Sequence, residues 1–260
     1  MTNNPQFQRP TFKIRGRKSP LALTFGILVI IGVLFTALSG FYADWLWFKS
    51  VDFTSTWSTI LGTKIFLFVV TGLLTASIVL ANVWIAYKRR PLYVSMTMES
   101  DNLERYRSQV EPIRRSLFIG GFLALFYFAG TSGSTLWSSW LLFRNSTEFG
   151  VNDPQFNMDI SFFAFRLPFW QTMIGWGIST LVLAIIASAV VHYLYGGIRL
   201  QVQEDRTTVA ARLQLSVLLG GVVLLKAVAY WFDRYALALK ESKIITGLTY
   251  TDVNLSLIHI

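Results

Sequence analysis

Five long apolar runs alternate with shorter polar connections along the 260-residue chain. The runs occupy residues 21–42, 65–87, 116–136, 169–195 and 213–232. Each is long enough to cross about 30 Å of hydrocarbon as an α-helix, which needs roughly 20 apolar residues. A helix satisfies its backbone hydrogen bonds internally, so it is the form that an isolated segment takes in lipid. The pattern therefore predicts an all-α, polytopic transmembrane protein with about five spans.

The first run follows a basic opening segment, so it could also be a signal peptide. Ala37 and Ser39 form a weak match to the small residues of a cleavage site. However, the apolar part of a signal peptide is usually about 7–15 residues long, and this run is longer. We therefore expect an uncleaved first span.

The polar connections differ in their content of basic residues, and this difference predicts the orientation. Residues 1–20, 88–115 and 196–212 hold fifteen lysines and arginines, whereas the connections on the opposite side hold six, with Lys64 and Lys226 counted at or within spans. Loops rich in lysine and arginine remain in the cytoplasm. The N-terminus is therefore expected inside the cell and the C-terminal end outside.

This orientation divides the chain into three parts. Residues 1–20 form a cytoplasmic basic tail, residues 21–232 a transmembrane module, and residues 233–260 an outer segment. Within the module, loop 88–115 is expected in the cytoplasm and loop 143–166 outside. Seven of the nine tryptophans then fall near the outer boundary, either as an anchoring belt or as a docking surface for further protein.

The cytoplasmic loop contains the sequence SDNLERYRSQVEPIRRS, which predicts a short helix capped by Ser100 or Asp101. Apolar residues recur on one face of this helix at Leu103, Tyr106 and Val110. The helix could lie on the bilayer with its arginines toward anionic lipid, or it could be a solvated linker. Pro112 suits the first turn of the next span, because its missing N–H has no partner there.

Composition supports membrane residence and argues against nucleic-acid binding. The chain is 53% hydrophobic and 14% charged, with a mean hydropathy of +0.49, whereas soluble domains are about 25% charged. The net charge of +9 comes from basic blocks between apolar runs rather than from one basic face. Membrane topology explains this distribution, so no nucleic-acid partner is expected.

Residues that could support catalysis are scarce. The chain has no cysteine, and its only histidines are His192 and His259. His192 is expected to have a structural role at a membrane interface. Phosphate-binding loops, zinc-protease motifs and nucleophile elbows are absent from the sequence. We therefore expect no catalytic residue, cofactor or metal site in this chain, although the question of enzymatic activity stays open.

Lys226 is the clearest ionisable residue inside an apolar run. Its insertion cost of about 2.5–3.5 kcal/mol is roughly offset by neighbouring leucines and valines at about 0.3–0.6 kcal/mol each, so this span needs its neighbours. The ammonium could snorkel outward or pair with Asp233, or it could belong to a substrate or ion site. None of the five runs contains an aspartate or glutamate, which argues against ion-coupled transport.

Three stretches carry a family resemblance: YADWLWFKSV (42–51), DPQFNMDISFFAFRLPFW (153–170) and GLTYTDVN (247–254). With them, the chain resembles the bacterial multi-pass membrane proteins grouped as uncharacterised protein family 0182. The resemblance implies about seven spans followed by a large extracytoplasmic domain, in the inner membrane of a bacterium. The chain stops earlier than that pattern, so we expect an N-terminal fragment whose residues 256–260 are not native.

The sequence favours a non-enzymatic membrane platform that anchors a larger extracytoplasmic domain. Its expected partners are the bilayer, anionic lipid at the cytoplasmic loop, and the outer domain or another envelope protein. The alternative is a transporter or channel component that uses Lys226 with the outer aspartates Asp44, Asp153 and Asp159. Arg166 and Asp159 are expected to keep the outer loop at the aqueous boundary. A third possibility is an enzyme whose active site lies in the outer domain.

Overall fold

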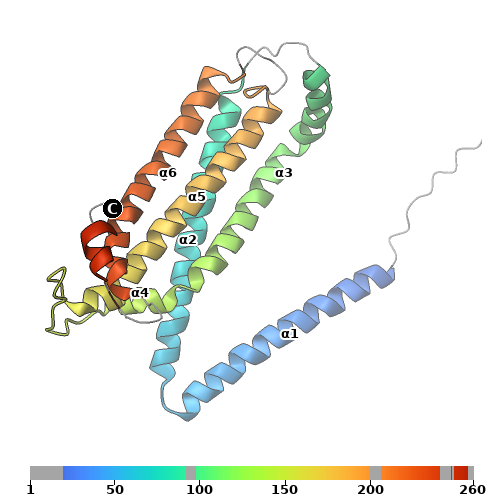
Figure 1. Ribbon diagram of the computed structural model, residues 1–260. Helices are drawn as coiled ribbons and strands as arrows, with labels where there is room; N and C mark the ends of the chain where they lie inside the picture. The colour runs from blue at the N-terminus through green and yellow to red at the C-terminus, as the bar shows by residue number, and fades with distance from the viewer. Residues whose placement is uncertain (1–19, 92–97, 200–205, 241–246, 248, 257–260) are drawn as a thin grey trace, which may run out of the picture. The chain divides into compact units, whose positions relative to one another are not determined.

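The computed structural model describes residues 20–91, 98–199, 206–240, 247 and 249–256. Their helices, shown in Figure 1, are α1 (Pro20–Ser50), α2 (Thr54–Lys88), α3 (Met98–Ser134), α4 (Trp137–Arg144), η1 (Phe162–Arg166), α5 (Leu167–Leu194), α6 (Val209–Ala236), η2 (Leu237–Leu239) and η3 (Asp252–Ser256). Five helices are long and apolar enough to cross a membrane. The predicted all-α transmembrane fold is therefore confirmed.

The chain forms two compact units, Met1–Thr59 and Ile60–Ile260. In the first unit, α1 ends at Ser50, and the chain then turns through Asp52, whose φ of 59° lies in the left-handed region. Aspartate tolerates this region better than most residues because its short side chain can bond locally. The Phe41 and Trp57 rings meet edge to face, with their centroids 5.0 Å apart.

The second unit is a bundle in which α2, α3, α5 and α6 run alongside one another (Figure 1). Its small apolar core contains Val79 of α2, Ala184 of α5 and Leu218 of α6. Most large apolar side chains point outward instead, as Leu219 and Val223 do on α6. This distribution suits a bundle in lipid. Lipid tails are as apolar as the side chains, so burying these side chains between helices gains little hydrophobic free energy.

Small residues allow α2 and α3 to approach each other closely. A Cβ atom added to Gly72 would lie 2.5 Å from the carbonyl oxygen of Phe126, and one added to Gly130 would lie 2.8 Å from that of Phe68. Thr71 donates a hydrogen bond across the crossing to the carbonyl of Ala129, at 3.2 Å. Small residues at membrane helix interfaces permit such contacts between backbones.

Helix α3 corrects the prediction of a short, separate helix before the third span. A single helix runs from Met98 to Ser134, and Pro112 lies inside it rather than in the first turn of a new one. The helix begins before Ser100 and Asp101, so neither residue caps it. Pro112 lacks the N–H that would bond the Ser108 carbonyl, and its ring crowds that carbonyl, so it weakens the helix at this point without ending it.

The segment between α4 and η1 is shorter than the predicted outer loop 143–166, because helices occupy both ends of that range. Helix α4 extends to Arg144, and η1 begins at Phe162 and continues directly into α5. Between them, the chain makes a tight excursion with an antiparallel bridge between Asn152 and Asp159. This segment lies at the opposite end of the bundle from the end of α5 and the start of α6 (Figure 1).

Candidate functional site

The two ends of the bundle differ in chemistry. The end of α2, the first half of α3, the end of α5 and the start of α6 meet at one end, which we call the basic end (Figure 1). Helix α4, loop 145–161 and the last turns of α6 meet at the other, which we call the aromatic end. Segments far apart in the sequence meet at each end because successive helices run in opposite directions.

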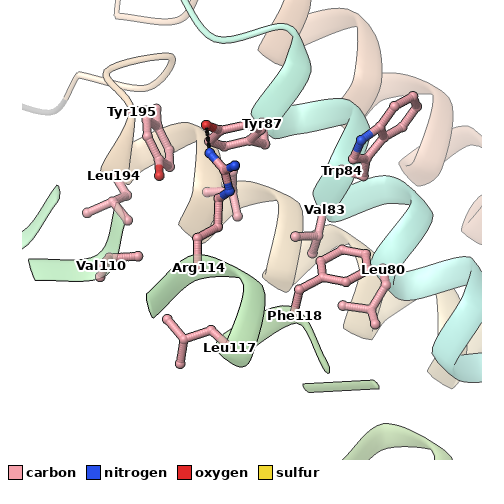
Figure 2. A pocket seen from close by; sticks show the side chains of 11 residues that line it. Leu80, Val83, Trp84, Tyr87, Val110, Arg114, Leu117, Phe118, Leu194 and Tyr195 are labelled. Atoms are coloured by element: carbon pink, nitrogen blue, oxygen red, sulfur yellow. Dashed lines mark hydrogen bonds between the residues drawn. The ribbon is translucent and has the colours of Figure 1, made fainter. Parts of the chain in front are cut away.

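Glu111 of α3 holds three helices together at the basic end. Its carboxylate accepts hydrogen bonds from the hydroxyls of Tyr87 on α2 and Tyr195 after α5, each at 2.9 Å, and from Arg114 Nη1 at 2.6 Å. Arg114 also donates to the Tyr87 hydroxyl, as Figure 2 shows. We call Glu111, Tyr87, Tyr195, Arg114 and Arg90 the Glu111 cluster.

The aromatic rings of the cluster carry arginines on their faces. Arg90 lies 4.2 Å from the Tyr87 ring centroid and 5.4 Å from that of Tyr195. The two rings meet edge to face at 5.2 Å. Burial, together with the hydrogen bond to Glu111, raises the pKa of Tyr195 to about 12, so this hydroxyl remains a donor at neutral pH. Guanidinium stacking and the shared carboxylate make the cluster a rigid, predominantly cationic group.

An apolar cavity of about 220 Å³ lies beside the cluster, between α2, α3 and α5 (Figure 2). Its lining is Leu80, Val83, Trp84, Tyr87, Val110, Arg114, Leu117, Phe118, Val191, Leu194 and Tyr195. Trp84, Leu117 and Phe118 are 53%, 51% and 40% exposed, so the cavity is open toward the surroundings of the bundle. Tyr87, Arg114 and Tyr195 therefore give the cavity one polar wall, and the rest of its lining is apolar.

A polar cleft of about 360 Å³ adjoins the other side of the cluster. It is lined by Arg90, Pro91, Glu104, Arg107, Ser108, Glu111 and Tyr195. Cavity and cleft share Tyr195. The cluster thus lies where an apolar compartment and a charged one adjoin, at Tyr195.

Arg107 contributes a donor to this cleft that is not satisfied. Its Nε donates to the carbonyl of Leu194, at 2.5 Å, and its Nη1 to Glu104, at 3.2 Å. The first contact satisfies a carbonyl at the end of α5, where a positive charge is also favoured by the helix dipole. Arg107 Nη2 is buried and has no hydrogen-bond partner among the described residues.

A second polar group, centred on Gln214 of α6, lies buried between three helices. Its Oε1 lies 3.0 Å from His192 Nε2 on α5, and its Nε2 donates to the carbonyl of Asn82 on α2, at 2.9 Å. His192 is 1% exposed, so its role is in the interior of the bundle. We did not single out Gln214 or Asn82 in the sequence, although a strongly polar residue within an apolar run signals such helix-to-helix bonds.

The polar residues singled out in the predicted outer loop form hydrogen bonds within that same stretch of chain. Asp159 accepts hydrogen bonds from the backbone N–H groups of Phe149, Gly150 and Ser161, at 3.1, 2.8 and 2.8 Å. Hydrogen bonds, chiefly those from Ser161, lower the pKa of Asp159 to about 2. Asp153 accepts from the N–H groups of two residues that follow it, Gln155 and Phe156. Arg166 donates to the Ser146 hydroxyl, at 3.2 Å.

The remaining predicted polar residues do not form a site with the loop. Lys226 is exposed on α6, with its ammonium 5.4 Å from the Tyr230 ring centroid. The described residues contain no ion pair between Lys226 and Asp233, which is partly exposed nearer the end of the helix. Asp44 is exposed on α1, in the first unit. The described residues also hold no group of three or more acidic or histidine side chains suited to a metal ion.

Aromatic residues attach loop 145–161 and η1 to the end of α6. The ring centroids of Phe156 and Phe162 lie 5.1 and 5.4 Å from that of Tyr235 on α6, and that of Phe163 lies 6.4 Å away. Arg234 stacks on Trp231 at 3.6 Å and also donates to the Tyr235 hydroxyl. The loop is therefore an ordered surface fixed to the end of α6.

Comparison with known proteins identifies relatives of the whole described bundle. The chain is 45% identical over 251 residues to a UPF0182 protein of Streptomyces coelicolor, 41% over 249 residues to one of Nocardioides, and 39% over 235 residues to one of Frankia casuarinae. The matches cover 95%, 95% and 90% of the chain but 25%, 25% and 23% of the relatives. The chain thus spans about a quarter of their length.

No solved structure matches the chain. The model of the uncharacterised protein family UPF0182 matches residues 21–260, which include all five apolar helices. This agrees with the resemblance carried by the three outer stretches. The chain therefore belongs to the uncharacterised protein family UPF0182.

Proposed function

We propose that this chain is a membrane platform that anchors and orients a larger extracytoplasmic region. The observation that carries the proposal is the character of the interior of the bundle. None of the buried residues described in α2, α3, α5 and α6 is an aspartate, glutamate, lysine or arginine. The buried polar residues are neutral or histidine, and they bond to neighbouring helices or to their own helix backbone. Such an interior favours a fixed scaffold.

The transport alternative has less support from the same residues. Lys226 is exposed on α6 rather than directed into the bundle. Asp153 and Asp159 are occupied by backbone N–H groups of their own loop. A coupling ion or substrate would have to compete with these bonds, so we do not assign the residues to a transport path.

The proposed platform lies in the inner membrane of a bacterium, with its N-terminus in the cytoplasm. The excess of lysine and arginine in residues 1–20, 88–115 and 196–212 supports this orientation. The basic end of the bundle is then cytoplasmic, and the aromatic end faces the extracytoplasmic region.

The proposed docking face is the outer surface of loop 145–161. Phe149, Val151 and Ile160 are 53%, 57% and 42% exposed, although Asp159 and Asp153 hold the backbone around them in a defined conformation. An ordered apolar surface at the aqueous boundary is typical of a protein contact. The relatives are about four times as long as the matched region, so they contain a substantial region that such a face could hold.

Orientation can be tested with reporters that are active only outside the cytoplasm. A reporter fused after Gly150 is expected to be active, and one fused after Asp101 is expected to be silent. The opposite pattern would contradict the proposed orientation. Equal protein levels of the two fusions serve as the control.

Anchoring can be tested in the full-length Streptomyces coelicolor relative. A protease site is placed just ahead of its large extracytoplasmic region, and intact spheroplasts are treated with the protease. We expect the cleaved region to remain on the membrane, and serine at the positions matching Phe149, Val151 and Ile160 to release it. Serine at the position matching Val209, which is exposed at the basic end, is the control. Release of the region from the unmodified protein would contradict the platform.

A further inference from the structure

We propose that the polar cleft and the apolar cavity at the basic end together bind one anionic phospholipid. Its phosphate would lie against Arg90 and Arg107, and one acyl chain would occupy the cavity between α2, α3 and α5. This inference concerns a ligand at the opposite end from the docking face, and it does not depend on the platform.

The volume and lining of the cavity favour hydrocarbon. A cavity of about 150 Å³ lined by apolar side chains stays dry and binds benzene, and this one measures about 220 Å³. Away from Tyr87, Arg114 and Tyr195, its walls are leucine, valine, phenylalanine and tryptophan. Its exposed residues, Trp84, Leu117 and Phe118, lie in helices of membrane-spanning length, so a lipid chain could enter sideways.

Guanidinium groups at the cleft can bind an anion. Arg90 and Arg107 line the cleft itself, Arg114 of α3 lines the adjoining cavity, and Lys88 and Arg89 lie nearby at the end of α2. Among the residues that the structure describes, Glu104 and Glu111 also line the cleft, so Arg114 supplies the net positive charge of this group. Glu111 already accepts bonds from two tyrosines and Arg114. Arginine guanidiniums lie over the rings of Tyr87 and Tyr195, so these two rings do not offer a free face to the choline group of a neutral lipid.

Two guanidiniums keep capacity for a phosphate. Arg107 Nη2 is a buried donor with no partner among the described residues. Arg90 Nη1 lies 3.9 Å from the nearest Glu111 oxygen, which is longer than a hydrogen bond. Both side chains line the same cleft. Phosphate oxygens would satisfy these donors, as they do in basic pockets between membrane helices.

The position of the cleft matches the position of a lipid headgroup. The cleft lies where α2 and α5 end, and the cavity follows from it along the apolar part of the same helices. A phospholipid likewise has a charged headgroup followed by apolar acyl chains. A soluble phosphate compound would fill the cleft and leave the cavity unused, so the paired compartments favour a lipid.

The test uses the purified chain in detergent, titrated with the anionic lipid palmitoyl-oleoyl-phosphatidylglycerol or its choline counterpart and followed by native mass spectrometry. We expect saturable binding of one phosphatidylglycerol, at least about tenfold tighter than phosphatidylcholine. Equal affinity for the two lipids would overturn the proposal. Displacement of the lipid by millimolar inorganic phosphate or glycerol phosphate would also overturn it, because it would indicate a soluble ligand.

Matched variants locate the site. Arg107→Gln removes the unpaired donor, and we expect about a tenfold loss of phosphatidylglycerol affinity, the size of one or two charge-assisted hydrogen bonds. Arg105→Gln removes the same charge from the same helix at an exposed position outside the cleft, and it should retain affinity. Equal losses in the two variants would mean that charge alone attracts the lipid, and would contradict a defined site.

The acyl compartment has its own pair of variants. Val83→Phe fills the cavity and is expected to weaken lipid binding at least fivefold, whereas Val69→Phe places the same ring at an exposed position of α2 away from it. Melting temperatures identify any variant that fails to fold. Full affinity in a folded Val83→Phe protein would exclude the cavity as the acyl site.

Discussion

Gly72 offers the sharpest test of how the bundle is held together. A Cβ atom at this position would lie 2.5 Å from the carbonyl oxygen of Phe126 and 3.0 Å from its ring. Ordinary contacts begin at 3.4 Å, so Gly72→Ala requires α2 and α3 to separate by about 0.9 Å. The backbone oxygen cannot rotate out of the way as a side chain could. The strain must therefore be relieved by moving a whole helix.

The free-energy balance of this substitution has three parts. Overpacking costs about 1–3 kcal/mol, and losing the hydrogen bond from Thr71 to Ala129 across the widened crossing costs about 0.6 kcal/mol. Alanine in place of a helical glycine returns about 0.8–1.0 kcal/mol through its better helix propensity. Overpacking outweighs propensity here, so we expect Gly72→Ala to lower the free energy of unfolding by about 1–3 kcal/mol.

The assay is unfolding of the purified chain from mild detergent into SDS, followed by far-UV circular dichroism and tryptophan fluorescence. Gly120→Ala is the matched control, since nothing lies within 4 Å of its added methyl group. The control should be unchanged or up to about 1 kcal/mol more stable. If Gly72→Ala were as stable as Gly120→Ala, the close crossing of α2 and α3 would be refuted.

Three further predictions concern polar residues. Gln214→Ala should lower the free energy of unfolding by about 1–3 kcal/mol in the same SDS assay, because it removes the hydrogen bonds that join Gln214 to buried His192, to buried Ser188 and to Asn82; an unchanged stability would contradict the buried network. The lowered pKa of Asp159 predicts that its support of the outer loop is present above about pH 4 and is lost as the pH falls from 3.8 to about 2. Pepsin cleavage within the loop should therefore rise over that interval, and Asp159→Asn should be cleaved readily throughout it; the same pH profile for both proteins would refute this role. Lys226→Leu should lower the free energy of membrane insertion of an isolated α6 segment by about 3 kcal/mol, measured by glycosylation of a reporter loop. The same substitution should change the stability of the folded chain little, since among the described residues the ammonium of Lys226 has no hydrogen bond or ion pair and lies only near the Tyr230 ring.

Hydropathy predicted the number and approximate positions of the spans because each run is long and predominantly apolar. It did not predict where the helices end, because helices continue into polar sequence beyond the apolar runs. Helix α3 begins at Met98, far ahead of the apolar run at 116, and continues through Pro112. Helix α4 was also missed, because its sequence WSSWLLFR resembles the end of a span followed by a loop.

The contacts that stabilise the bundle were harder to infer from sequence. Gly120 and Gly130 belong to the same helix, yet only Gly130 touches α2. Which glycine faces a neighbour depends on the rotation of the helix, and an almost uniformly apolar helix gives no periodic signal of that rotation. The partners of Glu111 could not be inferred for another reason. Tyr87 and Tyr195 are far from Glu111 in the sequence and meet it only because the ends of α2 and α5 lie beside α3.

The arginines of the basic end illustrate why counting charges leaves a site undetected. Every arginine in residues 88–115 contributes equally to the predicted orientation, but only some of them line the cleft. Arg107→Lys separates the two roles, because it keeps the charge while replacing a planar fork that bonds Leu194 and Glu104 with a single ammonium. Orientation should be unaffected, whereas phosphatidylglycerol affinity should fall nearly as far as in Arg107→Gln. A lysine variant with full lipid affinity would show that charge alone, rather than guanidinium geometry, accounts for the binding.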